Sequence, residues 1–104
     1  MIRGTTPTHT FTISEEQPFD VSLIADLRIS YAQCGKEILV KNLQDVTLDG
    51  KTITLKLSQE DTLSFDCGKR IVEIELTVLT TGGDVMKYQT SENVDKCINE
   101  DVLK

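Results

Sequence analysis

Residues 71–90 alternate between apolar and polar side chains over much of their length, and this regularity constrains the fold more than any other feature of the chain. A period of two is that of a β-strand with one buried face. The side chains on the expected buried face are Val72, Ile74, Leu76 and Val78. The sequence TTGGD at 80–84 predicts a hairpin loop, after which 85–90 continues as a second strand. The pattern therefore predicts a hairpin whose first strand lies at the centre of a sheet with one solvated face.

Shorter runs with similar alternation predict further strands in the first part of the chain. These runs lie at 8–13, 27–32, 37–42, 45–49 and 52–57. Asp49 and Gly50 predict a two-residue type I′ turn, because both central residues of that turn have positive φ, and the QCGKE stretch at 33–37 predicts another hairpin. Ser58 followed by Asp61 resembles a capping box, which predicts a single helical turn that crosses from one sheet to the other. Together these elements predict an all-β fold, an immunoglobulin-like antiparallel β-sandwich of about seven to eight short strands with one short helical turn.

One internal segment allows two secondary structures. Residues 19–35 could form a helix, but Leu27, Ile29 and Tyr31 alternate with polar or small side chains, which favours a loop that leads into a strand. A brief helical turn at 22–26 remains open.

The two ends of the chain are expected to be less regular than its middle. We predict one domain, 1–104, with an extended N-terminal arm at about 1–7, where a glycine and a proline disfavour a helix. The tail from 91 could be a final strand or a helix. We expect its first half to be extended and about 99–104 to be loosely ordered, because its Asn and Asp residues are poor helix formers and chain ends fray.

The charge distribution disfavours several classes of partner. The chain has a formal net charge of -6, and its 11 basic residues are scattered. Nucleic acid and anionic membrane surfaces both require a basic footprint, so neither is expected as a partner. No charged and apolar leader or long apolar run is visible, which predicts neither a signal peptide nor a membrane span.

The residues that could carry chemistry do not converge in the sequence. Cys34, Cys67 and Cys97 are an odd number without a CxxC pair, so we expect reduced cysteines, with Cys34 and Cys67 exposed beside glycine turns. His9 has no nucleophile at a motif spacing, so we expect a surface or edge-strand role for it. Adjacent acidic pairs occur at Glu15 and Glu16, at Glu60 and Asp61, and at Glu100 and Asp101. Neighbours on a strand point to opposite faces and cannot share a proton or a metal. We therefore predict no enzyme activity, no catalytic or metal site and no cofactor.

The outer side of the 71–80 strand is a candidate interaction surface. The charged side chains of Glu73 and Glu75 would keep this side solvated. Ile71 and Leu79 are the apolar residues on the same side. These four residues are the ones we expect to meet a protein partner or a second copy of the chain.

Four stretches of the chain also carry a family resemblance. They are IRGTTPTHTF, FDVSLIADLRISYAQCGKEI, DVTLDGKTITLKLSQEDTLSF and IVEIELTVLTTGGDV. Over about residues 1–92 they resemble small prophage-encoded proteins of Firmicutes from tail and baseplate gene clusters, and are similar to the N-terminal domain of phage baseplate upper proteins. The resemblance implies a non-enzymatic structural or adaptor component of a phage tail or baseplate, located in the virion or in the host cytoplasm. It would act through contacts with itself or with other tail proteins. The alternative is a sandwich that recognises a carbohydrate or a cell-surface protein through loops 34–36 or 81–84.

Overall fold

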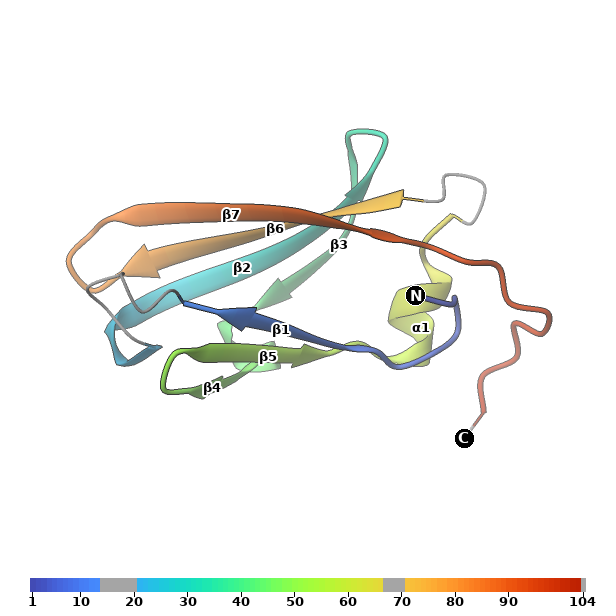
Figure 1. Ribbon diagram of the computed structural model, residues 1–104, viewed down its shortest axis with the longest axis horizontal. Coiled ribbons are helices and arrows are strands. Elements are labelled where there is room, and N and C mark those ends of the chain that lie inside the picture. The colour runs from blue at the N-terminus through green and yellow to red at the C-terminus, as the bar shows by residue number, and fades with distance from the viewer. Residues whose placement is uncertain (14–20, 67–70, 104) are drawn as a thin grey trace.

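The protein folds as two antiparallel β-sheets that face each other, with one short α-helix at one end (Figure 1). The computed structural model describes residues 1–13, 21–66 and 71–103. Its elements are β1 (Thr8–Thr12), η1 (Val21–Leu23), β2 (Ile24–Gln33), β3 (Lys36–Asn42), η2 (Leu43–Asp45), β4 (Thr47–Asp49), β5 (Thr52–Lys56), α1 (Gln59–Leu63), β6 (Ile71–Thr80) and β7 (Val85–Asn93). The smaller sheet has the order β1-β5-β4 and the larger one β3-β2-β6-β7. The predicted antiparallel β-sandwich with one helical turn is confirmed.

The core lies between the inner faces of the two sheets. The predicted inner set of β6 is buried, and β2 contributes Leu27, Ile29 and Tyr31 on the same face. The smaller sheet contributes Ile53 and Leu55, which alternate along β5 with more exposed threonines. Period-two alternation therefore placed the core side chains correctly in both sheets.

The strand β6 occupies the interior of the larger sheet, between β2 and β7, as its alternation predicts. The loop that follows it is a tight turn in which the Thr80 N–H donates to the Asp84 carbonyl at 2.9 Å. Gly83 has φ +90° in this loop, a value that side chains disfavour. The predicted hairpin at 80–84 is confirmed.

The helix α1 begins at the predicted capping box. The Ser58 side chain accepts from the Asp61 N–H at 3.1 Å, and the Asp61 carboxylate accepts from the Ser58 N–H at 2.9 Å. The helix carries the chain from β5 in the smaller sheet towards β6 in the larger one, as expected. The predicted glycine turn at 67–70, including Cys67, lies outside the described residues, as does the acidic pair at 15–16.

The predicted turn at Asp49 and Gly50 is wrong by one residue. Asp49 pairs with Thr52, so the loop of this hairpin is Gly50 and Lys51 rather than Asp49 and Gly50. Only Gly50, at φ +57°, has positive φ there, so the chain uses the glycine at the first central position, as in a type II′ turn. Both central residues have positive φ instead in the turn of Cys34 (φ 50°) and Gly35 (φ 76°).

The ends of the chain are tied to each other by backbone hydrogen bonds. The Arg3 N–H donates to the Asp95 carbonyl at 3.0 Å, and the Asp95 N–H donates to Met1 at 2.7 Å. β7 extends to Asn93, so the extended alternative for the start of the tail is confirmed, and residues 94–103 contain no helix. The helical turn considered at 22–26 is instead η1, because Ile24 already pairs with Thr80.

Candidate functional site

The predicted interaction residues lie on the outer face of β6 but do not form one patch. Ile71 is 52% exposed and Leu79 is 38% exposed, and Glu73 is exposed between them. The two apolar residues are eight positions apart, or about 27 Å at 3.4 Å per residue. Neither is buried under the N-terminal arm. The role of these residues stays a prediction.

The face between Ile71 and Leu79 is a ladder of polar side chains that satisfy one another. Glu75 accepts from the Gln89 amide at 2.7 Å and from Lys87 Nζ at 3.1 Å, and Lys87 also donates to Thr77 at 3.0 Å. The hydrogen bonds from Gln89 and Lys87 hold the pKa of Glu75 below its usual value. This ladder is a solvated surface with its own partners, so it offers little unsatisfied hydrogen bonding to a second protein.

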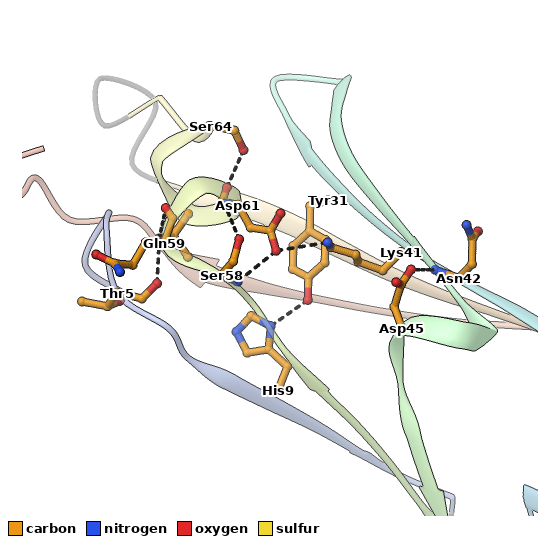
Figure 2. A network of polar contacts seen from close by, with 11 residues as sticks. Thr5, His9, Tyr31, Lys41, Asn42, Asp45, Ser58, Gln59, Asp61 and Ser64 are labelled. Carbon is orange, nitrogen blue, oxygen red and sulfur yellow. Dashed lines mark hydrogen bonds and ion pairs between the residues drawn. The ribbon is translucent and has the colours of Figure 1, made fainter. Parts of the chain in front are cut away.

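A partly buried polar contact joins the two sheets at His9. Its Nδ1 lies 2.7 Å from the hydroxyl of Tyr31, which belongs to β2 (Figure 2). Its Nε2 lies 2.7 Å from a carboxylate oxygen of Glu92 on β7, close enough for an ion pair although the geometry is not that of a straight hydrogen bond. The His9 ring is also stacked on Tyr31 with a centroid distance of 5.7 Å.

Of the two roles expected for His9, at the surface or on an edge strand, the structure bears out the edge strand and not the surface. β1 is an edge strand, as predicted, but the His9 side chain is only 13% exposed and points into the sandwich. The signal was present in the sequence, since His9 has the same parity as Phe11 and Ile13, whose alternation predicts the inner face. What the sequence did not show is the identity of its partners on β2 and β7.

Two nearby carboxylates affect the pKa of the Tyr31 hydroxyl. Burial raises the pKa of Tyr31, and the negative charges of Glu92 and Asp61 raise it further. Asp61 is itself fixed by Lys41 Nζ, 3.1 Å away, and by its cap with Ser58 (Figure 2). Although burial alone would raise the pKa of Asp61, the hydrogen bonds from Ser58 and Lys41 lower it overall. Lys41 therefore offsets the charge of Asp61, as the Met1 amino group, 3.3 Å from Glu92, offsets the charge of that carboxylate.

An open groove runs between β1, the edge of the smaller sheet, and β7, the edge of the larger one. Tyr88 pairs with Leu76 and Thr90 with Ile74, so both point to the same side as the core residues of β6. Both are nevertheless exposed, because no described strand of the smaller sheet lies beyond β1 to cover them. The larger sheet has four strands and the smaller sheet three, and the groove marks the place of the fourth.

The groove has an apolar end and a polar end. The apolar end is a hollow of about 110 Å³ lined by Phe11, Thr12, Ile13, Leu76 and Tyr88. The polar end is lined by Thr8, His9, Thr10, Thr90, Ser91 and Glu92, together with Phe11 and Ile74. Phe11 belongs to both linings, so the two ends are continuous.

The free edge of β1 presents unpaired backbone groups to this groove. The Ile13 N–H donates to Lys51 at 2.7 Å, and Pro7 accepts from the Leu57 N–H at 3.0 Å, so the odd-numbered residues face β5. By the alternation of an antiparallel ladder, the N–H and C=O groups of the even-numbered residues point away from β5. These residues are Thr8, Thr10 and Thr12, and within the described chain no strand pairs with them on that side.

β1 differs from the other three edges in carrying no charged side chain other than a histidine. Sheet edges usually carry charges, prolines or bulges, or are very short, which prevents unwanted pairing. β4 has only three residues and ends in Asp49, β3 contains Lys36, Glu37 and Lys41, and β7 contains Lys87 and Glu92. β1 has the sequence THTFT.

The residues expected to be chemically inert do not assemble into a metal or catalytic cluster. Among the described residues, no three His, Cys, Asp or Glu side chains gather closely enough to hold a metal ion. Cys34 is exposed, as expected, and Cys97 is partly buried. Glu100, of the acidic pair at 100 and 101, forms an ion pair with Arg3 at 2.5 Å. No helix in 1–13, 21–66 or 71–103 is long and apolar enough to cross a membrane. The absence of enzyme activity and of a cofactor stays a prediction.

By class, the chain is an antiparallel β-sandwich of one three-stranded and one four-stranded sheet. No protein-family model matches it, and no curated protein matches it either. Among solved structures it is similar to the crystal structure of CopC from Methylosinus trichosporium OB3b, at 14% sequence identity and a TM-score of 0.47. The match covers 88% of this chain and 98% of that chain.

This match corrects the function expected from the sequence. It is to a CopC rather than to a tail or baseplate protein, so the expected role as a structural component of a phage tail or baseplate is wrong. The carbohydrate-binding alternative finds no support in the match either. A TM-score below 0.5 at this identity transfers no ligand from CopC to the present chain.

Proposed function

We propose that the protein is a non-enzymatic interaction domain that binds an extended segment of another protein chain by strand addition to β1. The observation that carries the proposal is the open, uncharged edge of β1 beside the uncovered groove under β7. In strand addition, backbone hydrogen bonds supply affinity, and pockets for alternate side chains supply specificity.

The geometry suits a single added strand. Thr8, Thr10 and Thr12 point their backbone donors and acceptors outwards, so a strand that pairs with them extends the smaller sheet to four strands. The added strand would cover Tyr88 and Thr90, which already face inwards. The formal net charge of -6 supports a protein partner over nucleic acid or an anionic membrane.

The test uses seven-residue peptides selected from a random displayed library against the full chain. A selected peptide, made synthetically, is titrated into ¹⁵N-labelled protein. We expect the amides of Thr8, Thr10 and Thr12 to shift, and their hydrogen exchange to slow by about tenfold or more, because they gain hydrogen-bond acceptors.

Two substitutions at one position provide a matched comparison. Thr10→Pro removes the outward N–H without removing a bond to β5, so we expect it to weaken binding at least tenfold. Thr10→Val keeps the N–H and should bind within about threefold of the parent. Circular dichroism verifies that both variants fold, and the exchange measurement on the parent does not depend on either.

Three results would overturn the proposal. One is a library that yields no binder above background. Another is a binder that shifts only the amides of the outer face of β6. The third is a dimer in sedimentation that Thr10→Pro dissociates, which would assign the edge to a second copy of the chain.

A further inference from the structure

We infer that the β1 groove selects an extended partner segment by two side chains, an aliphatic residue followed two positions later by arginine. The inference rests on the proposed strand addition and adds the chemistry and the direction of the partner. It comes from the unequal ends of the groove, one apolar and one polar with the Glu92 carboxylate.

The apolar end accepts one side chain. The hollow of about 110 Å³ between Phe11 and Tyr88 is somewhat smaller than a cavity that holds benzene, about 150 Å³, and so has room for one aliphatic group. Because Phe11 has its backbone bonds towards β5, a residue that faces it from the free side forms a non-hydrogen-bonded pair. Side chains approach most closely in such pairs, so an aliphatic residue opposite Phe11 enters the hollow.

The polar end favours a cation. A residue two positions along the same added strand faces His9, whose Nε2 is 2.7 Å from Glu92. Glu92 remains 34% exposed although it also lies 3.3 Å from the Met1 amino group. A carboxylate can accept about four hydrogen bonds, so Glu92 has room for another donor.

The Glu92 carboxylate at this end is complementary to arginine. No lysine or arginine side chain lines the polar end, and the nearby cations are the Met1 amino group, 3.3 Å from Glu92, and Lys41, 3.1 Å from Asp61 behind Tyr31. Arginine presents several donors in one plane, which can reach the Glu92 carboxylate and the Thr90 hydroxyl together.

The direction of the partner follows from the sheet. The paired strands of the described residues are all antiparallel, with one isolated parallel bridge, between Ile2 and Asp95, outside the strands. Antiparallel pairing is slightly more stable per residue than parallel pairing. An antiparallel strand meets Phe11 before His9, so its order from N- to C-terminus is aliphatic residue, any residue, arginine. A parallel strand would show the reverse order.

Two peptides of identical composition test this inference. They are acetyl-Thr-Thr-Leu-Thr-Arg-Thr-Thr-amide and acetyl-Thr-Thr-Arg-Thr-Leu-Thr-Thr-amide, each titrated into the ¹⁵N-labelled full chain. We expect the first to bind about tenfold more tightly, since only it places both side chains correctly on an antiparallel strand. A third peptide with glutamate in place of arginine should bind more weakly than the first by at least the same factor.

The variant Glu92→Gln separates charge from shape. It keeps the size of the side chain and should reduce the preference for arginine over glutamate to about threefold or less, with the shifts at Thr8, Thr10 and Thr12 retained.

The outcomes distinguish the two proposals. If all three peptides shift the β1 amides with equal affinity, strand addition stands and the inferred specificity is wrong. If the reversed peptide binds more tightly, the inferred direction is wrong. If Glu92→Gln leaves the preference unchanged, Glu92 is not the acceptor. If no peptide shifts these amides but library selection yields a peptide that binds the β1 edge, the inferred motif is wrong and the proposed strand addition stands. If neither the three peptides nor the library yields a binder at this edge, both the motif and the strand addition are wrong.

Discussion

Removal of the Tyr31 hydroxyl is the sharpest test of the contact that joins the two sheets. Tyr31 is fully buried, and its hydroxyl is 2.7 Å from His9 Nδ1. In Tyr31→Phe the ring still fills the core, so the change removes one hydrogen bond and leaves the imidazole nitrogen without that partner. A net hydrogen bond contributes about 0.5–1.5 kcal/mol, and an unsatisfied buried group costs about 1–3 kcal/mol.

The expected cost lies in the lower part of this range. Because His9 is 13% exposed and can recover some hydration, we expect Tyr31→Phe to lower the free energy of unfolding by about 1–2 kcal/mol. For a domain of about this size, that corresponds to a decrease of roughly 5–15 °C in the melting temperature. Urea unfolding followed by far-ultraviolet circular dichroism measures the change.

The second tyrosine of the chain provides the control. Tyr88 is 38% exposed, and no hydrogen bond to its hydroxyl is seen within the described residues, so Tyr88→Phe should change stability by less than about 0.5 kcal/mol. In a His9→Ala background, Tyr31→Phe should lose most of its effect, because the partner is gone. Equal losses for the two tyrosines, or an undiminished loss in the His9→Ala background, would refute a stabilising contact between His9 and Tyr31.

Three further predictions concern the cap, a turn and the free edge. Asp61→Asn should destabilise the protein by about 1–2 kcal/mol at pH 7, because it loses the charge facing Lys41 and weakens the cap. Because the pKa of Asp61 is lowered in the folded protein, its contribution to the free energy of unfolding is complete above the unfolded pKa, near 3.8, and is lost as the pH falls through the folded pKa. The free energy of unfolding should therefore fall less steeply in acid for the variant than for the parent. Gly50→Ala should lower stability in thermal unfolding by about 1–2 kcal/mol because Gly50 has φ +57°, although an added Cβ would meet no atom within 4 Å. Gly82→Ala is the control and should be nearly neutral, because φ is not positive there. Equal effects of the two substitutions would contradict the turn assignment. In the free protein, amide exchange should be fast at Thr8, Thr10 and Thr12 and slow at His9 and Phe11, and uniform protection along β1 would mean that the edge is covered.

The sequence predicted those parts of the fold that depend on local patterns. The alternation at Val72, Ile74, Leu76 and Val78 specifies the inner face of a strand without reference to anything distant. The Ser58 and Asp61 cap is likewise contained within four residues.

The parts that failed depend on register or on distant partners. Asp49 and Gly50 lie side by side in the sequence, yet which residues become the loop depends on the pairing of Asp49 with Thr52. His9 meets Tyr31 and Glu92, which are 22 and 83 positions away, and no local pattern encodes which strands face each other. The groove could not be predicted for the same reason, because it follows from the unequal number of strands in the two sheets.

The way β1 joins the smaller sheet has a consequence for folding. The hairpins β2 with β3, β4 with β5 and β6 with β7 close over short loops, whereas β1 pairs with residues that follow it by 40 to 48 positions. Long loop closure delays such pairings, so we expect β1 to dock after the β4 and β5 hairpin has formed. In the folded protein the same five residues should detach in a local opening that leaves the other strands intact. A ligand that binds the edge of β1 would then stabilise the last strand to arrive, and so would slow unfolding more than it accelerates folding.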